Sequence, residues 1–370
     1  MPVRSFGQYR SSVNPAETDP SWVIAGHRIQ IPIMASAMDG VVDVRFAIAF
    51  GKLGGLAVLN LEGVQTRYED PREVLDEIAH ASTEEATNLV QGLYTQPIQE
   101  KLISKRIREI KDAGVPAVVS SIPQRAEHFG EIAADAGVDF FVVQSTVTTV
   151  QHLSTEYETL KFEDFCKKMP VPVIVGNTVG YRVSLALMEA GIDGLLVGIG
   201  PGAACTTRGV LGIGVPQVTA TVDCAAARDM FYKNSGKYVP IITDGGMRTG
   251  GDICKALAAG ADAVMLGSPF ARAEEAPGHG FHWGMATPHA NLPRGTRVRV
   301  GTTGTLEQIL LGPAGVDDGS QNLVGAIQTS MGNVGATTIR DFQRTELIIA
   351  PSIGTEGKLL QRAQAVGMGK

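Results

Sequence analysis

A short phrase that recurs along the chain restricts its fold more than any other feature. Residues 112–115, 135–138, 189–192 and 259–262 each contain an Ala-Gly pair, and each lie just before an apolar segment. A helix that ends on a glycine in the left-handed conformation, with a buried strand starting a few residues later, produces this pattern. The phrase therefore predicts parallel units in which a helix leads into a strand.

Short apolar and β-branched runs mark the expected strands. They cover residues 31–34, 56–59, 117–120, 140–144, 173–176, 194–198, 239–242 and 263–267. Eight such repeats predict a closed (β/α)8 TIM barrel, formed by residues 1–370 as a single catalytic domain. The alternative, a doubly wound open sheet, would be favoured by a Gly-x-Gly-x-x-Gly turn after the first strand, where this chain reads ASAMDG.

Composition excludes several classes of protein. A net charge of -6, without a block of Lys and Arg, argues against a nucleic-acid-binding surface. No run approaches the roughly 18 apolar residues of a membrane span, and the start, MPVRSFGQYR, lacks the apolar core of a secretion signal. The cysteines, at positions 166, 205, 224 and 254, show no metal-ligand spacing. We expect a cytoplasmic enzyme that binds small molecules, with no nucleic-acid or membrane partner.

The most informative segment follows the sixth expected strand. Residues 198–208 read GIGPGAACTTR, which places a glycine-rich loop and Cys205 at the catalytic end of a barrel. The amides of such a loop can hold a phosphate and its carbonyls a monovalent cation, while the thiol of Cys205 faces the substrate. The competing interpretation is a tight turn followed by a small buried cysteine.

Two more glycine-bearing turns follow the last two expected strands. Residues 244–248 read DGGMR, and Gly267 and Ser268 end the eighth strand. Adjacent turns after strands seven and eight form a common phosphate site in barrels, and Asp244 is placed to accept hydrogen bonds from ribose hydroxyls. A phosphorylated nucleoside is therefore the expected class of ligand.

The chain continues well beyond the eighth strand. Residues 277–295 are rich in Gly and Pro, 296–300 predict a strand, and a helix is expected from Asn322. We expect residues 277–305 or so to form a flap over the site. A separate helix, over residues 101–113, has apolar residues at helical spacing with its basic residues directed outward, and is interpreted as a solvated helix without a binding function.

In combination, these motifs resemble the IMP dehydrogenase and GMP reductase family. The family's Gly-x-Gly-Pro-Gly-x-x-Cys-Thr-Thr loop is matched at 198–207 and its Asp-Gly-Gly-x-Arg phrase at 244–248. Its Gly-Ser phrase, its later Glu-Glu-x-Pro-Gly, its first-strand loop and its Gly-Asn are matched at 267–268, 274–278, 36–39 and 176–177. The match spans most of the chain, which resembles a divergent subfamily without the CBS domains of the dehydrogenases.

The resemblance implies a purine nucleoside monophosphate substrate (GMP, IMP or XMP), attacked at C2 by the thiolate of Cys205 with Thr207 as the second catalytic residue. The substrate would be held by Ser36, Met38, Asn177, Gly202, Ala203, Asp244, Gly246, Met247, Gly267, Ser268, Gly284 and Met285. The nicotinamide cofactor would contact Gln144, Ser145 and Thr146, and K+ would bind the carbonyls of Gly200, Gly202 and Cys205. The family also implies a homotetramer or homo-octamer.

The two reactions of the family differ in the groups that carry protons. The resemblance implies that a dehydrogenase activates water with an Arg-Tyr pair on a long flap, and no such pair occurs between residues 284 and 304. A reductase has a Glu where this chain has Pro288, so His289 or another group would have to substitute. We expect a GMP reductase that uses NADPH and forms IMP and ammonia.

Two alternatives stay open. One is an IMP dehydrogenase that uses NAD and forms XMP, with Arg294 or Arg297 as the base; the other is a non-catalytic nucleotide-binding regulator. Ala203 also replaces a Ser that contacts phosphate in the family, a loss on the order of 1 kcal/mol. Gln144 and Ser145 replace an Asp near the nicotinamide, which leaves the orientation of the cofactor less well supported.

Overall fold

The computed structural model describes residues 3–5, 12–151, 160–284, 295–349 and 358–367. Its centre is a closed parallel barrel in the order β10-β11-β4-β5-β6-β7-β8-β9. The strands are β4 (Ile33–Ala35), β5 (Leu56–Asn60), β6 (Val118–Ser121), β7 (Phe140–Gln144), β8 (Val173–Thr178), β9 (Gly194–Val197), β10 (Ile241–Asp244) and β11 (Ala263–Leu266). The predicted TIM barrel is confirmed.

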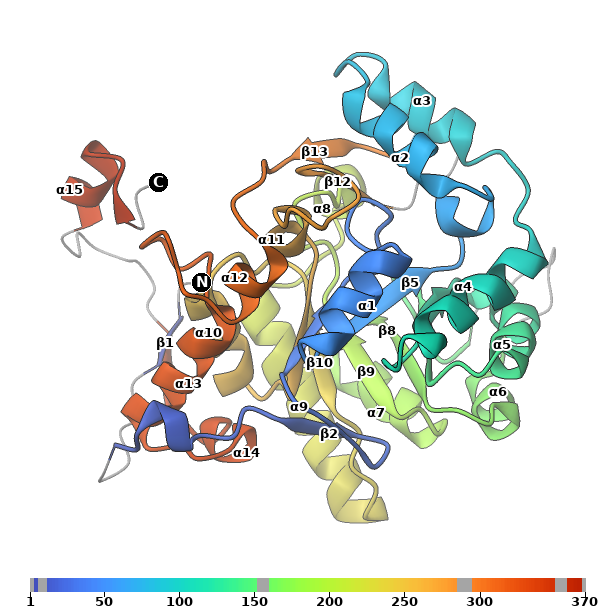
Figure 1. Ribbon diagram of the computed structural model, residues 1–370. Coiled ribbons are helices and arrows are strands. Elements are labelled where there is room, and N and C mark those ends of the chain that lie inside the picture. Colours follow the sequence, from blue (N-terminus) through green and yellow to red (C-terminus); the bar gives the residue numbers. More distant parts are fainter. Residues whose placement is uncertain (1–2, 6–11, 152–159, 285–294, 350–357, 368–370) are drawn as a thin grey trace.

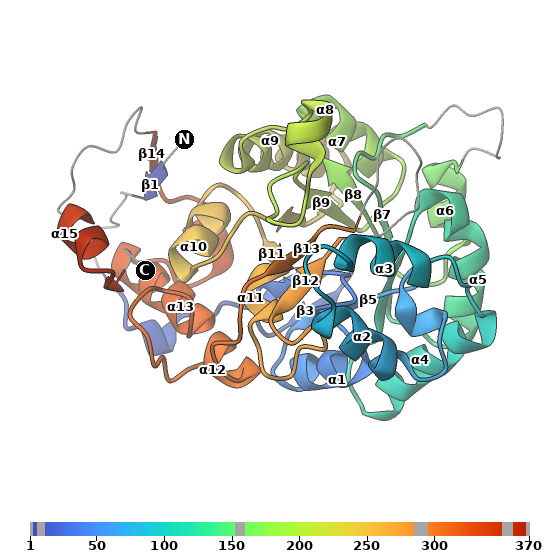
Figure 2. The same ribbon diagram turned by 90° about the horizontal axis from the view of Figure 1, so that it is seen from above.

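Helices surround the barrel, as Figures 1 and 2 show. They include α1 (Val44–Lys52), α4 (Glu100–Asp112), α5 (Ala126–Asp135), α6 (Phe162–Lys168), α7 (Tyr181–Glu189), α9 (Gln217–Ser235), α10 (Gly250–Ala258) and α13 (Leu323–Val334). The glycines of the recurring phrase lie in the left-handed region, with φ of 75° at Gly114, 86° at Gly137, 100° at Gly191 and 108° at Gly260. The local signal for a helix end before a strand is confirmed at all four positions.

Two expected strands begin two residues later than predicted, because each starts directly after a proline. Strands expected from residues 31 and 239 start at Ile33 and Ile241. Pro32 and Pro240 have no amide hydrogen for the ladder. Their carbonyls still accept bonds from Val264 at 2.9 Å and Leu195 at 3.0 Å, so each proline marks the first rung.

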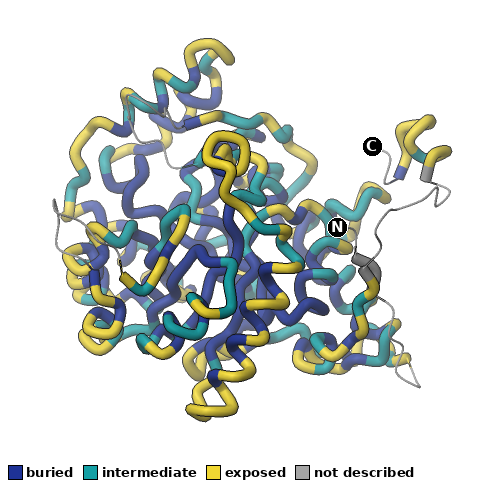
Figure 3. The backbone as a smooth tube through the Cα atoms, turned by 180° about the vertical axis from the view of Figure 1, so that it is seen from behind, coloured by how far each residue is buried: buried dark blue, intermediate teal, exposed yellow. Residues whose placement is uncertain are grey.

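The core has two layers, which follow from the alternation of side chains along a strand. Val118 and Phe140 point into the barrel, while their neighbours Val119 and Phe141 pack against the surrounding helices. The hairpin of β2 (Trp22–Ile24) and β3 (His27–Ile29) closes the amino-terminal end of the barrel. Figure 3 shows the resulting buried centre and exposed outer loops.

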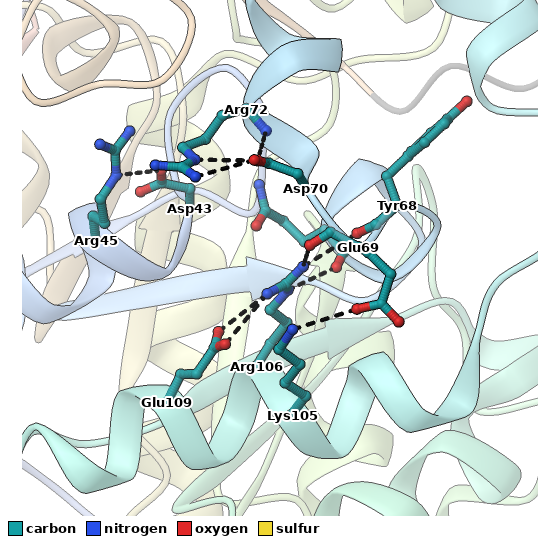
Figure 4. A network of polar contacts seen from close by, with 10 residues as sticks. Asp43, Arg45, Tyr68, Glu69, Asp70, Arg72, Lys105, Arg106 and Glu109 are labelled. Carbon is teal, nitrogen blue, oxygen red and sulfur yellow. Dashed lines mark hydrogen bonds and ion pairs between the residues drawn. The ribbon is translucent and has the colours of Figure 1, made fainter.

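The loop between β5 and α4 carries two helices that the sequence analysis did not predict, α2 (Pro71–His80) and α3 (Ala86–Leu93). Arg106 of α4 is buried beneath the start of this loop. Its guanidinium donates to the carbonyls of Gln65 at 3.0 Å and Glu69 at 2.8 Å (Figure 4). The interpretation of residues 101–113 as having basic residues outward is therefore wrong at Arg106, which clamps the preceding loop.

Beyond β11, the predicted strand and helix are both present. β12 (Phe281–Trp283) pairs antiparallel with β13 (Arg297–Arg299), and Asn322 caps α13. The tip of the expected flap, residues 285–294, lies outside the described residues. At the ends of the chain, β1 (Val3–Ser5) pairs with β14 (Leu347–Ile349). In the part of the chain that is described, no helix has the length and apolar character to cross a membrane.

A buried polar chain ties the base of this hairpin to the barrel. The hydroxyl of Tyr94 donates to the carboxylate of Asp39, and Trp283 Nε1 donates to the same hydroxyl at 3.0 Å. The amide of Val64 also donates to Asp39, at 3.0 Å. A side chain at Gly63 would lie 2.1 Å from the Asp39 carboxylate, so only glycine leaves room for this contact.

We expect Tyr94→Phe to lower the free energy of unfolding by about 1–3 kcal/mol. The buried Asp39 carboxylate and the Trp283 indole N–H would each lose the hydrogen bond that they make to the Tyr94 hydroxyl. Urea unfolding measures this change. The matched variant is Tyr68→Phe, which removes a partly exposed hydroxyl that donates to the Leu93 carbonyl at 2.9 Å. It should cost less than about 1 kcal/mol, and equal losses in the two variants would refute the special role of the Asp39 network.

Candidate functional site

A cavity of about 600 Å³ opens at the carboxyl-terminal ends of the barrel strands, the end that Figure 2 faces. Every described residue of the predicted site lines it: Ser36, Met38, Gln144, Ser145, Thr146, Asn177, Gly200, Gly202, Ala203, Cys205, Thr207, Asp244, Gly246, Met247, Gly267, Ser268 and Gly284. Met285 lies outside the described residues. The fold thus brings these residues together, while the role of each stays a prediction.

Cys205 differs from the other cysteines in its surroundings. It is exposed, and its thiol lies 3.2 Å from the hydroxyl of Thr207, the first residue of α8 (Thr207–Leu211). Burial raises the pKa of Cys166 and Cys224 to about 12 and that of Cys254 to about 11. The competing interpretation of Cys205 as a small buried cysteine is therefore wrong, and it is the accessible thiol of the four.

The glycine turns around Cys205 are packed too closely to admit side chains. A Cβ at Gly200 would lie 2.7 Å from Arg208, one at Gly246 2.9 Å from Pro201, and one at Gly267 2.8 Å from the sulfur of Met38. Gly200 and Gly246 also have φ of 73° and 80°. These turns expose backbone to the cavity, which suits contact with an anionic ligand.

The loop is also held by hydrogen bonds to its own carbonyls. Arg208 donates to the carbonyls of Ile199 at 3.1 Å and Val215 at 2.6 Å, which ties both ends of the segment together. The Cys205 amide donates to the Gly202 carbonyl at 3.1 Å. The Gly202 carbonyl, one of the predicted K+ ligands, thus already accepts one hydrogen bond within the loop. The K+ site stays a prediction.

Asp244 is held in place by two side-chain amides. Gln144 and Asn177 donate to its Oδ2 at 3.0 and 2.8 Å. Burial raises the pKa of Asp244 to about 6, and these hydrogen bonds oppose the shift. Because both amides use Oδ2 among the described contacts, Oδ1 is the oxygen that a ribose hydroxyl would approach.

His282 was missed by the sequence analysis. It lies on β12, is buried, and its Nε2 is 3.0 Å from the Ser268 hydroxyl, next to the predicted phosphate site. Burial lowers the pKa of His282 to about 4, so the ring is neutral near pH 7. No local motif marks this residue, because only the pairing of β12 with β13 carries it to the cavity.

The end of β5 contributes a second group of residues that the sequence analysis missed. Asn60 and Glu62 line the cavity together with Ser120, Ser121 and Ile122 from the end of β6. Parallel strand ends always reach this rim of a barrel, so their position after two expected strands was the available signal.

One predicted candidate for the base is excluded by its contacts. Arg297 donates to the carbonyls of Ala79 at 3.0 Å and Ala81 at 2.8 Å, at the end of α2. Its guanidinium also lies 4.2 Å from the centre of the Phe281 ring. Arg297 therefore caps a helix and does not line the cavity, while Arg294 and His289 lie outside the described residues.

Comparison with known proteins agrees with this architecture. The sequence model of the IMP dehydrogenase/GMP reductase domain matches residues 7–358. The chain belongs to this family. It is 36% identical to an uncharacterized oxidoreductase of Mycolicibacterium smegmatis, over 92% of this chain and 93% of that protein. The inosine-5'-monophosphate dehydrogenase of Cryptosporidium parvum is 30% identical, over 85% of this chain and 82% of the enzyme.

A solved structure shows the same similarity in three dimensions. The crystal structure of an IMP dehydrogenase/GMP reductase-like protein from Corynebacterium glutamicum matches with a TM-score of 0.88 and 34% identity. The match covers 94% of this chain and 93% of that one. The chain is thus an oxidoreductase of a family that binds purine nucleoside monophosphates and uses a nicotinamide cofactor.

The raised pKa of Asp244 generates a prediction on pH dependence. A ribose hydroxyl donates best to the ionised carboxylate, so nucleotide affinity should be full above about pH 7 and fall as the pH drops through 6, by up to about tenfold per unit. Asp244→Asn should bind GMP about tenfold more weakly at pH 8. Calorimetric titration from about pH 5 to 8 measures both profiles.

The phosphate of the nucleotide titrates in the same range, so the difference between the wild-type and Asp244→Asn profiles is the relevant quantity. The exposed variant Asp223→Asn should keep the wild-type profile. Parallel profiles for wild type and Asp244→Asn would show that Asp244 does not contact the ligand.

The packing of Gly246 against Pro201 generates a second prediction. Gly246→Ala should weaken GMP binding by about tenfold, because the new methyl group forces the turn away from Pro201 and disfavours its positive φ. The matched control is Gly180→Ala, at a negative φ of -123° with nothing within 4 Å of the added methyl group. Wild-type affinity in Gly246→Ala would show that this turn does not hold the ligand.

Proposed function

We propose that this oxidoreductase works through a covalent bond between Cys205 and C2 of a purine nucleotide, and that it reduces GMP to IMP. The observation that carries the proposal is the exposed thiol of Cys205, 3.2 Å from the Thr207 hydroxyl, on the same cavity as the turns at Gly246 and Ser268. These turns would hold the phosphate, and Asp244 the ribose. The base would then lie over the Cys205 loop.

In this mechanism, the thiolate of Cys205 attacks C2 of GMP and the bond from C2 to the exocyclic nitrogen breaks. The amine leaves as ammonia after it gains a proton, and the hydroxyl of Thr207 is the described group placed to pass that proton. When bound, NADPH supplies the hydride to C2. The carbon–sulfur bond then breaks, which releases IMP and restores the thiolate.

Three described groups, Asp244, His282 and Arg297, are not placed to supply the base that hydrolysis needs. Asp244 is engaged by two amides, and His282 is neutral and contacts Ser268 on the phosphate side. Arg297 caps α2. Among the described residues, none of these groups is placed as a base for water at an adduct on Cys205, and ammonia release requires no attacking water.

The other components of the proposal rest on the family resemblance. NADPH would contact Gln144, Ser145 and Thr146, which line the same cavity. The carbonyls of Gly200, Gly202 and Cys205 would hold K+, and the chain would assemble as a homotetramer or homo-octamer. Carbonyl oxygens are suitable ligands for a monovalent cation, which supports the choice of donors.

IMP dehydrogenase, with NAD, is the second candidate, and the named relatives favour it. Besides the Cryptosporidium enzyme, the inosine-5'-monophosphate dehydrogenase of Thermoplasma acidophilum is 40% identical over 56% of this chain. The Cryptosporidium match covers 82% of that enzyme, so a dehydrogenase can be of similar length to this chain. The absence of a CBS insertion therefore does not favour the reductase.

Two assays run side by side test the proposal. With GMP and NADPH, we expect loss of the reduced nicotinamide absorbance together with formation of IMP. Cys205→Ala should lower the rate by at least about a thousandfold, since no other cysteine among the described residues lines the cavity. Cys166→Ala, which changes a thiol away from the cavity, should stay within about twofold.

The competing outcomes are distinct. Formation of XMP from IMP and NAD, without GMP-dependent oxidation of NADPH, would show that the protein is an IMP dehydrogenase and would refute the proposed reductase activity. If turnover occurs and rapid-quench mass spectrometry finds no purine attached to the Cys205 peptide, the covalent step is refuted. Nucleotide binding with no turnover in either assay would favour a non-catalytic regulator.

A further inference from the structure

A buried carboxylate lines the cavity at a place that the proposed reaction does not use. Glu62 follows β5 by two residues, and its side chain is only 6% exposed. Glu62 and Asp244 are the two carboxylates among the described residues that line the cavity. Asp244 belongs to the nucleotide side, so the function of Glu62 is open.

Glu62 is held rigidly by its neighbours. Its Oε1 accepts hydrogen bonds from the Ser121 hydroxyl at 3.0 Å and the Ile122 amide at 3.4 Å. Its Oε2 lies 3.2 Å from Nη1 of Arg125. Burial raises the pKa of Glu62 and the charge of Arg125 opposes that shift. A buried carboxylate with this many partners is pre-organised as a hydrogen-bond acceptor.

The backbone of Glu62 is fixed as well. Its amide donates to Asn60 Oδ1 at 2.9 Å, and its carbonyl accepts from Arg67 Nη2 at 3.0 Å. The rest of the loop, from Gln65 to Glu69, is clamped by the buried Arg106 (Figure 4). Both the backbone and the carboxylate of Glu62 are therefore fixed by several contacts.

The order of strands places Glu62 across the barrel from the nucleophile. β5 and β9 are four strands apart in a closed ring of eight, so the loops that carry Glu62 and Cys205 start from opposite sides of the mouth. A nucleotide bonded to Cys205 would be held by residues that follow or end β8, β10, β11 and β4. The side of β5, β6 and β7 is left for a second ligand.

The end of β7 supplies no carboxylate for the ribose of a second nucleoside. A ribose offers two neighbouring hydroxyl donors, which a carboxylate accepts well. Gln144, at the end of β7, instead directs its Nε2 toward Asn177 and Asp244, each at 3.0 Å. The ends of β6 and β5 add Ser120, Ser121, Asn60 and Glu62 to the lining, and Glu62 is the one carboxylate among these four residues.

We propose that Glu62 binds the nicotinamide cofactor by accepting hydrogen bonds from the hydroxyls of its nicotinamide-side ribose. The proposal rests on the proposed function for the identity of the second ligand. It makes Glu62 a binding residue for the cofactor, with no part in proton transfer, and Arg125 the partner that holds the carboxylate in place.

Binding without turnover tests this proposal separately from the reaction. Protein saturated with GMP is titrated with NADP+ or with NAD+, pairs that cannot complete a turnover because an oxidised cofactor has no hydride to give. Glu62→Gln should weaken binding of the better dinucleotide by about tenfold or more. Affinity for GMP should stay within about twofold, since GMP lies on the opposite side.

Two further variants act as controls. Glu62→Asp keeps the charge but draws it back by one methylene, so we expect a smaller loss than in Glu62→Gln. Glu131→Gln, an exposed change on α5, should leave both affinities unchanged. Thermal unfolding and GMP binding establish that each variant is folded.

The outcomes decide between a binding role and a structural one. Selective loss of dinucleotide affinity supports the proposal, even if no turnover is found with any substrate pair. Unchanged dinucleotide affinity in a folded Glu62→Gln protein, or equal weakening of GMP and dinucleotide, overturns it. The second result would show that the ion pair with Arg125 only supports the barrel rim.

Discussion

The closed ladder of hydrogen bonds between the eight parallel strands is the constraint on which the rest of this structure depends. The pairing of β11 with β4, the last and first strands of the barrel, completes the ring, so no strand of the barrel has an unpaired edge. All the strands then end on one rim. Residues separated by more than 200 positions, such as Met38 and Gly267, come into contact there through this closure alone.

The ring also divides the cavity between two groups of strands. The turns after β9, β10 and β11 are glycine-rich and contact one another through backbone, as at Gly246 and Pro201. The ends of β5 and β6 present polar side chains, with Glu62 held between Ser121 and Arg125. Backbone turns suit a phosphate, and a fixed carboxylate suits hydroxyl donors, so the two halves are chemically matched to different ligands.

The hairpin of β12 and β13 is joined to the barrel by buried polar contacts. Trp283 contacts Asp39 through Tyr94, and His282 contacts Ser268. Consecutive residues of β12 thus reach two different parts of the rim, because side chains alternate along a strand. Family membership establishes the class of reaction, while its direction depends on proton-carrying groups that differ between members.

Much of the scaffold was predictable because its signals are local. The Ala-Gly phrases, the loop with Cys205 and the turn after Asp244 each depend on backbone conformations that a few residues specify, and the sequence by itself determined the barrel and the side of it that carries the site. Arg106, Glu62, His282 and Arg297 were different. Whether such a side chain is buried, faces the cavity or caps a helix depends on partners 14 to more than 200 residues away, such as Ser268 for His282 and Ala79 for Arg297. Only the tertiary structure decided their roles, because long polar side chains take their positions from the donors and acceptors that folding brings near them.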